Sequence, residues 1–413
     1  MRKESQLGLY NWSTHNEIEA PVRKPLSYVE IDDETWRDGM QGTQTTRHPN
    51  TEKRKEYLVT AARLGYIDHA DIGFPGSGPK HRREIVKLIR SLEEEKVRIT
   101  LSTAGRGAAI DDVRAILEIA EKTGYPLEAD LFLDVSVLRA NIEGWDRKEK
   151  INQLRNNISL VKNEGLPVMF VPERITAIPP DEVYEVLRMA IDLGVDRICI
   201  ADTQGIATPW GVSNIFRWVF KEIGEKNKNV KFDFHEHNDL GMGIANCLVA
   251  AQEGIDRLHA TVGGIGERAG NVNLEQLLVV LSAKDFRNTD VREIRKFAQM
   301  AADILRLKIP SHEPIIGEQS TGTASGIHAS TYGKTQNEGL PPIYFPYDLD
   351  DIGAKALVKI GPTSGMANVM IFCKKEFGID NITEEKAHEI LNYAKERGGI
   401  LSRETVKRLL ERD

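Results

Sequence analysis

The stretch VKFDFHEHND, residues 230–239, has the alternating pattern of a buried β-strand that ends in polar residues. Phe232 and Phe234 fall on one face of such a strand, and His235 and His237 fall on the other, because side chains alternate with a period of two. The pattern therefore predicts a strand whose apolar face meets a packed layer. At its end, two imidazoles point in one common direction.

The same form recurs along the chain: a short apolar run, a loop, and then a segment with helical spacing. Strands that alternate with helices predict parallel pairing, and eight such units within residues 28–285 predict a (β/α)8 TIM barrel, typically about 250 residues long. An open doubly wound sheet is the alternative, but no G-x-G-x-x-G motif follows the first run. The eight runs are 28–34, 67–74, 97–103, 127–136, 167–173, 196–202, 230–237 and 256–264.

The chain changes character on either side of this repeat. Residues 1–27 are expected to form an N-terminal extension, and residues 286–413 a small, mostly helical C-terminal linker region without a regulatory domain. The glycine-rich stretch 310–346 is longer than most connecting loops, which favours a functional role for it.

Composition restricts the class of protein. The 413 residues are 40% hydrophobic and carry a formal net charge of −7 without a basic stripe, which argues against nucleic-acid binding. The three cysteines give no disulfide framework. No apolar run reaches the ~18 residues of a membrane span, and the start of the chain does not resemble a signal peptide. We therefore expect a cytoplasmic protein that does not bind membranes.

Polar residues gather where the predicted strands end, which is the catalytic face of a TIM barrel. Taken singly, a strand-end aspartate often caps the next helix, and a lone histidine is usually structural. His235 and His237 together with Asp38 are more specific, because two imidazoles and a carboxylate suit an open divalent-metal site. The strand-end set comprises Arg37, Asp38, Gln41, Asp71, Ser136, Arg139, Glu173, Asp202, Thr203, His235, His237, Glu267, Arg268 and Asn271.

Three motifs carry a family resemblance: RDGMQ (37–41), HEHNDLGMGIANCLVAAQEG (235–254) and GGIGERAGNVNLEQL (263–277). They resemble the 2-isopropylmalate synthase and homocitrate synthase family of metal-dependent acyl-CoA condensing enzymes. That family is a branch of the metallolyase TIM-barrel superfamily that includes hydroxymethylglutaryl-CoA lyase. The resemblance extends from about residue 28 to the C-terminus.

This resemblance implies a Claisen-type condensation of acetyl-CoA, or another acyl-CoA, with a 2-oxo acid, followed by thioester hydrolysis. Arg37 matches the arginine that stabilises the enolate, and Asp71 stands where the superfamily often has a glutamate. The divalent cation would be Zn²⁺, Mg²⁺ or Mn²⁺. Its ligands by resemblance are Asp38, His235, His237 and Asn271.

The C-terminal region resembles the linker subdomains of the same family. His328 in SGIHAS and Tyr344 in PIYFPYDLDDIG match residues that form a proton-transfer group with Glu173, and the tyrosine implies a homodimer with an intersubunit active site. Relatives usually follow the glutamate with aspartate and, three residues later, arginine. This chain has Arg174 and Ala177 there.

The identity of the 2-oxo acid stays open at this point. Ser136 and Arg139 resemble the pair that holds the distal carboxylate of 2-oxoglutarate, to which an arginine fork is suited. Ala109, however, stands where that branch tends to have histidine, so 2-oxoisovalerate, pyruvate and oxaloacetate remain alternatives. The residues expected to bind substrate are Gln41, Asp71, Ser136, Arg139 and Thr203.

Other reactions on this scaffold have signature residues that this chain lacks. The lyase branch has a cysteine in the loop after strand eight, where this chain has Ile265, and carboxyltransferase relatives have a barrel lysine that LPVMFVPER (166–174) lacks. A catalytically silent metal-binding scaffold would have little reason to carry Arg37, Glu173 and His328 together. Condensation is the favoured reaction.

Overall fold

The computed structural model describes residues 23, 25–45, 48–224, 229–337 and 344–412. Most of the predicted N-terminal extension, 1–27, therefore lies outside the described residues. The chain divides into two compact units: one contains residues up to 289 together with 297–307, and the other contains 290–296 together with 308–413. A boundary at residue 285 stays a prediction.

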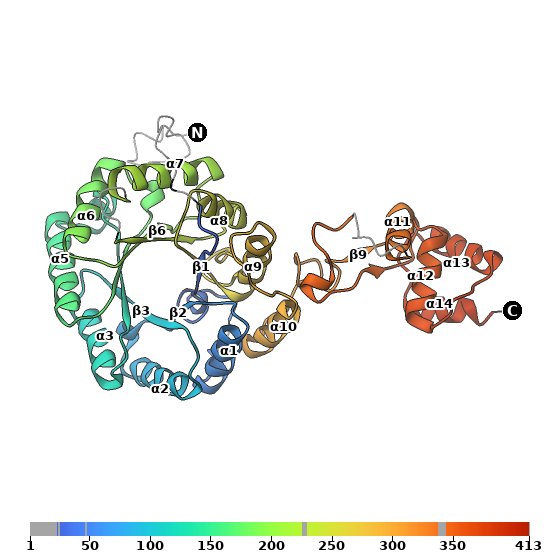
Figure 1. Ribbon diagram of the computed structural model, residues 1–413, viewed down its shortest axis with the longest axis horizontal. Helices are drawn as coiled ribbons and strands as arrows, with labels where there is room; N and C mark the ends of the chain where they lie inside the picture. Colours follow the sequence, from blue (N-terminus) through green and yellow to red (C-terminus); the bar gives the residue numbers. More distant parts are fainter. Residues whose placement is uncertain (1–22, 24, 46–47, 225–228, 338–343, 413) are drawn as a thin grey trace. The chain divides into compact units, whose positions relative to one another are not determined.

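The first unit is a closed barrel in which neighbouring strands are parallel and follow the order β1 to β8 (Figure 1). Closure comes from β1 pairing with β8, with Glu30 opposite Arg257 and Asp33 opposite Ala260. The predicted (β/α)8 barrel is confirmed. The strands are β1 (Glu30–Asp33), β2 (His69–Asp71), β3 (Thr100–Arg106), β4 (Glu128–Leu133), β5 (Val168–Pro172), β6 (Arg197–Asp202), β7 (Lys231–Glu236) and β8 (Arg257–Ala260).

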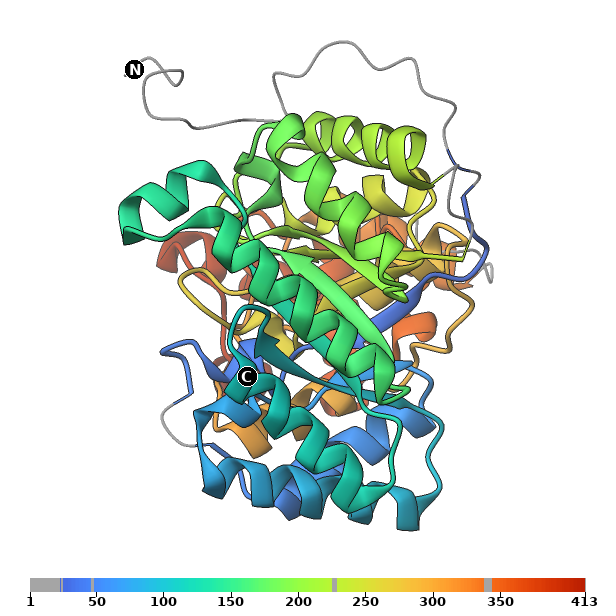
Figure 2. The ribbon, with the colours of Figure 1, turned by 90° about the vertical axis from the view of Figure 1, so that its left-hand side faces the viewer.

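Helices form a layer around the outside of these strands, as Figures 1 and 2 show from two directions. Side-chain caps begin several of them; for example, Asn50 accepts a hydrogen bond from the backbone N–H of Lys53 at the start of α1. The helices of the layer are α1 (Thr51–Arg63), α2 (Pro79–Glu95), α3 (Ile110–Thr123), α4 (Val137–Glu143), α5 (Arg147–Asn163), α6 (Pro180–Asp192), α7 (Pro209–Val219), α8 (Gly243–Gln252) and α9 (Leu274–Ala283). Helix α10 (Ile294–Leu305) has residues in both units.

The two faces of β7 separate as the alternation predicts. Phe234 packs edge-on against Phe216 of α7 at a centroid distance of 5.4 Å, and Phe232 packs in the same way against Phe220. Asp233, on the opposite face, forms ion pairs across the barrel interior. The apolar face of the strand thus holds the helical layer in place, and the polar face is left for the interior.

The barrel interior is unusually rich in charge, whereas branched apolar residues normally dominate this position in TIM barrels. Arg257, which is 1% exposed, donates to Glu128 at 2.8 Å and also pairs with Asp233. Arg197 donates to Asp233 at 2.7 Å. Removing one partner of such a buried pair would leave an uncompensated charge in the interior.

His259 of β8 belongs to this network and contacts a carboxylate with each ring nitrogen. Its Nδ1 lies 3.0 Å from Glu34 Oε1, and its Nε2 lies 3.1 Å from Asp233 Oδ2. Burial alone would lower the pKa of His259, but Asp32, Asp233 and Glu34 raise it to about 9. His259 is therefore an imidazolium at neutral pH.

This charge predicts how stability depends on pH. A raised folded-state pKa stabilises the protein fully below the unfolded pKa of about 6.5 and loses that effect as pH rises through about 9. We expect the urea midpoint of the barrel to fall between pH 7 and pH 10, with a loss of up to about 3 kcal/mol from this group. His259→Gln should remove most of that slope. An unchanged slope in the variant would contradict the assignment.

The second unit contains a short parallel pair, β9 (Gly322–Thr323) with β10 (Leu357–Val358), and the helices α11 (Gly326–Asn337), α12 (Met366–Phe377), α13 (Glu384–Arg397) and α14 (Arg403–Leu410). The predicted helical C-terminal region is confirmed. Its apolar core lies mainly among the last three helices and consists of Ile360, Val369, Phe372, Cys373, Ala387, Ile390, Leu391, Ala394, Leu401, Val406 and Leu409.

Within the described residues, the helices are all too short or too polar to traverse a lipid bilayer.

Candidate metal centre and active site

Three predicted metal ligands meet at the carboxyl ends of β1 and β7. His235 and His237 bring their Nε2 atoms to 3.4 Å from each other, and Nε2 of His237 lies 3.7 Å from Asp38 Oδ2. All three side chains are buried. The period-two alternation of β7 and the turn after β1 therefore produce the juxtaposition that the sequence predicts.

The charges of these groups suit a cation. Burial lowers the pKa of His235 to about 3, so its ring is neutral at physiological pH. Burial would raise the pKa of Asp38, but Arg37 and the two histidines lower it below its ordinary value. The facing Nε2 atoms of His235 and His237 lie beside the carboxylate of Asp38. This nitrogen and oxygen donor set fits a divalent metal.

Asn271 joins the cluster from the loop after β8. Its Nδ2 donates to Asp38 Oδ2 at 2.6 Å and to the carbonyl of Ile265 at 2.9 Å, and its buried Oδ1 has no hydrogen-bonding partner. A Cβ on Gly266, at φ 146°, would lie 2.1 Å from the Asn271 amide nitrogen. The glycine of the GERAGN motif therefore makes room for the amide, whose free oxygen is available to a cation.

Arg37 is fixed beside the metal ligands by three carboxyl groups. Its nitrogens lie 2.7 Å from Glu34, 2.8 Å from Asp38 and 2.9 Å from Asp71. Asp71 reaches Arg37 despite having one methylene fewer than the glutamate usual in the superfamily. The guanidinium is thus held in place before any substrate arrives, which is the condition for electrostatic catalysis.

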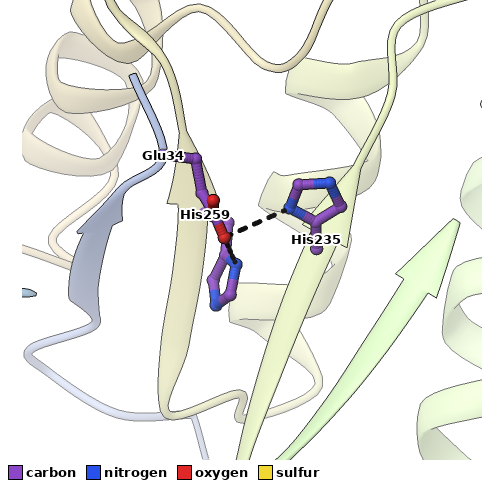
Figure 3. Close-up of side chains that lie close together, drawn as sticks. All are labelled: Glu34, His235 and His259. Carbon is purple, nitrogen blue, oxygen red and sulfur yellow. Dashed lines mark hydrogen bonds and ion pairs between the residues drawn. The ribbon is translucent and has the colours of Figure 1, made fainter. Parts of the chain in front are cut away.

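Two residues of this centre were missed by the sequence analysis. Figure 3 shows Glu34 and His259 beside His235. Glu34 Oε1 lies 3.0 Å from His259 Nδ1 and 3.8 Å from His235 Nδ1. Both residues belong to apolar runs, 28–34 and 256–264, for which the sequence predicts strands but no site residue at these positions. The period-two alternation of strand β8 could have identified His259, because it lies two residues after the inward-facing Arg257 and so points into the barrel as well.

A cavity of about 110 Å³ opens onto these groups. Glu173 stands on its wall, and burial together with the neighbouring charge of Asp134 raises the pKa of Glu173 above its ordinary value. Of the residues expected to bind substrate, Gln41 and Thr203 are in the lining. The described lining consists of Glu34, Arg37, Asp38, Gln41, Ala104, Asp130, Phe132, Met169, Val171, Glu173, Cys199, Ala201, Thr203, His235, His237, His259 and Glu267.

Comparison with known proteins agrees with this geometry. The profile of the HMGL-like family matches residues 28–301, which cover the whole barrel. The chain belongs to the HMGL-like family. It is therefore an enzyme of that family, with a buried cluster that could bind a divalent metal.

Among curated relatives, the probable 2-isopropylmalate synthase of Methanopyrus kandleri is 30% identical over 382 residues, covering 90% of this chain and 70% of its own. The 2-isopropylmalate synthase of Sulfolobus acidocaldarius is 28% identical over 345 residues, covering 82% and 83%. Among solved structures, the HMG-CoA lyase of Bacillus subtilis has a TM-score of 0.59 at 18% identity, covering 70% of this chain and 97% of that one. This last likeness concerns the fold.

Two predicted substrate residues of this HMGL-like enzyme have other partners. Ser136 caps α4, donates to Asp134 at 2.6 Å and lies 3.1 Å from Arg174. Arg139 pairs with Glu143 at 2.8 Å, and its side chain is 46% exposed. Neither residue lies in the described lining of the cavity.

Arg174 stands where relatives usually have aspartate, and it connects neighbouring strand ends. Its backbone adopts a left-handed conformation at φ 53°, its guanidinium pairs with Asp134 at 2.7 Å, and its N–H donates to Thr203 Oγ1 at 2.9 Å. The departure from the family pattern therefore links the ends of β4, β5 and β6.

His328 and Tyr344 lie together in the second unit. Their rings stack at a centroid distance of 4.0 Å and an interplanar angle of 19°, and both side chains are exposed. Their predicted meeting with Glu173 stays a prediction.

The metal centre leads to a direct prediction. His237→Ala removes one of three convergent ligands, so we expect the affinity of metal-stripped protein for Mn²⁺ or Zn²⁺ to fall at least about tenfold in calorimetric titration. His312→Ala, at an exposed histidine of the second unit, is the control and should bind as the parent does. Equal affinity in both variants would remove His237 from the ligand set.

Proposed function

We propose that the protein condenses an acyl-CoA such as acetyl-CoA with a 2-oxo acid and hydrolyses the resulting thioester, as enzymes of the 2-isopropylmalate synthase type do. The observation that carries the proposal is the position of Arg37. Its guanidinium lies in one cavity with Asp38, His235 and His237. The curated relatives named 2-isopropylmalate synthase support the same reaction class.

The chain's residues divide the chemistry. Glu173, with its raised pKa, is suited to take a proton from the acyl methyl group. Arg37 stabilises the negative charge that develops on the enolate oxygen and then on the former keto oxygen. His328 and Tyr344 complete the proton transfer with Glu173 in the homodimer that the family resemblance implies. Water then attacks the thioester carbonyl, the C–S bond breaks, and CoA leaves as the thiol.

A divalent cation held by Asp38, His235 and His237, with Asn271 beside them, would supply Lewis acidity for the 2-oxo acid carbonyl.

Ile265 favours condensation over the lyase-type reaction. The side chain is 4% exposed and packs against Gly39, where a Cβ would lie 3.0 Å from its Cγ1. An apolar, packed residue therefore occupies the loop position at which the lyase branch has its cysteine thiol.

The lining of the cavity favours a 2-oxo acid without a second carboxylate. Arg37 is the only lysine or arginine among its described lining residues, and Arg139 and Arg174 pair elsewhere. Asp130, buried on the wall, has a pKa well above its ordinary value because of burial and Glu128. His259, the imidazolium of the wall, is already paired with Glu34 and Asp233. A distal carboxylate would therefore find no unpaired cation among the described lining residues, whereas Phe132, Met169 and Val171 would accept an apolar group.

A path for the acyl-CoA leads away from the same cavity. A neighbouring pocket of about 250 Å³ shares Arg37 and Gln41 with it, and that pocket in turn shares His48 with a groove of about 880 Å³. Lys53 and Lys80 line the groove. We assign the groove to the CoA phosphates, for which lysine ammonium groups are suitable partners.

The reaction is tested with a panel of 2-oxo acids, acetyl-CoA and Mg²⁺ or Mn²⁺, with thiol release as the signal and product mass as the identification. We expect 2-oxoisovalerate or pyruvate to be turned over at least about tenfold more efficiently than 2-oxoglutarate, since an unpaired buried charge costs more than ~1.4 kcal/mol. No thiol release with any acid would sink the proposed reaction. A preference for 2-oxoglutarate that disappears in Arg139→Leu would restore the sequence-based role of Arg139.

The groove is tested by the double variant Lys53→Ala/Lys80→Ala. We expect the KM for acetyl-CoA to rise about three- to tenfold with little change in kcat, because exposed charge contacts contribute about 1 kcal/mol or less each. Lys87→Ala/Lys122→Ala, on exposed parts of α2 and α3, is the matched control. If the two double variants had equal KM values for acetyl-CoA, the CoA phosphates would not bind in this groove.

A further inference from the structure

Glu34 lies between the two functional parts of the centre. Its Oε2 is 2.7 Å from Arg37 Nη2. Its Oε1 is 3.8 Å from His235 Nδ1, and Figure 3 shows these two side chains facing each other. His235 Nδ1 is buried and has no hydrogen-bonding partner. One carboxylate therefore faces both the catalytic guanidinium and the rear nitrogen of a metal ligand.

The carboxylate is itself held from behind. His259 Nδ1 lies 3.0 Å from Glu34 Oε1, and His259 Nε2 lies 3.1 Å from Asp233. Asp233 is fixed by Arg197 and Arg257. Burial would raise the pKa of Glu34, but Arg37 and His259 hold it well below its ordinary value, so the group is ionised. The ion pairs of the barrel interior thus extend through His259 to Glu34, which lies next to the Nδ1 side of His235.

We propose that Glu34 is a positioning residue that sets the orientation of Arg37 and of the His235 imidazole together. The proposal rests on the proposed function for the role of Arg37, but its effect on His235 concerns metal affinity alone. A carboxylate behind a ligating imidazole orients the ring and makes it a better ligand, and loss of such a partner typically costs about 10–100-fold in metal affinity.

The alternatives for Glu34 are less consistent with its surroundings. A purely structural ion pair would need one cationic partner, yet Glu34 contacts Arg37 and His259 through different oxygens. A role as a metal ligand in its own right would compete with both contacts. A role as the general base would require a free oxygen, whereas both oxygens of Glu34 face cationic partners.

The test uses Glu34→Gln, which keeps the shape and removes the charge. Metal-stripped protein is titrated with Mn²⁺ in a calorimeter, and kcat and KM are then measured with the best substrate pair. We expect about tenfold weaker metal binding and a fall in kcat that exceeds the change in KM for acetyl-CoA. Glu34→Asp should restore neither property fully, since the shorter side chain cannot keep both contacts.

Glu236→Gln is the matched control. Glu236 is also a buried glutamate, adjacent to both histidines in sequence, but it faces the opposite side of β7 and bonds to Asn246 at 2.6 Å. We expect metal affinity in this variant to equal that of the parent.

The outcomes separate the two proposals. Metal affinity in Glu34→Gln equal to that of the parent would overturn the positioning role, whatever the activity. A parent protein that binds no divalent metal, or binds it and releases no thiol with any 2-oxo acid, would instead overturn the proposed function. If Glu34→Gln fails to fold, Glu34→Gln/His259→Gln removes the opposing charge as well, and its metal affinity tests the same point.

Discussion

The site depends on one buried carboxylate, that of Asp38, which has polar partners on two sides. One oxygen lies 2.8 Å from Arg37, and the other accepts from Asn271 at 2.6 Å and lies 3.7 Å from His237. A group 3% exposed can stay ionised only because these partners replace its hydration. Arg37 and the predicted metal position are therefore tied together through a single side chain, and neither can move without the other.

The charged barrel interior explains how such a site can be rigid. An apolar core would support the strand ends by packing alone, whereas here Arg257 and His259 connect β8 to β4, β7 and the turn after β1. Buried ion pairs contribute little net stability but penalise any arrangement that separates the partners. The interior thereby favours one arrangement of the strands, in which His235 Nδ1 lies 3.8 Å from Glu34 Oε1.

Much of this could be predicted from sequence, for reasons that differ between residues. The strands and the shared direction of His235 and His237 follow from local alternation, which needs no knowledge of distant residues. The contact between Glu34 and His259 does not follow from local alternation, because 225 positions separate the two residues and only barrel closure brings them together. For Arg139 the competing signal is local. Glu143 lies four residues further along the same helix, the spacing at which helical ion pairs form, so the sequence itself offers this partner in place of a substrate carboxylate.

Charge balance links the geometry to the chemistry. Glu34 and Asp38 are anionic, Arg37 and His259 are cationic, and burial with the nearby charge of Glu34 raises the pKa of Asp71 well above its ordinary value. The cluster is thus close to neutral by itself, although both proposed substrates are anions. Bringing an anion into a neutral, buried site costs its hydration without a matching charge. A divalent cation at the convergent nitrogen and oxygen atoms would supply that charge, so the same neutrality that stabilises the folded centre makes substrate binding depend on the metal.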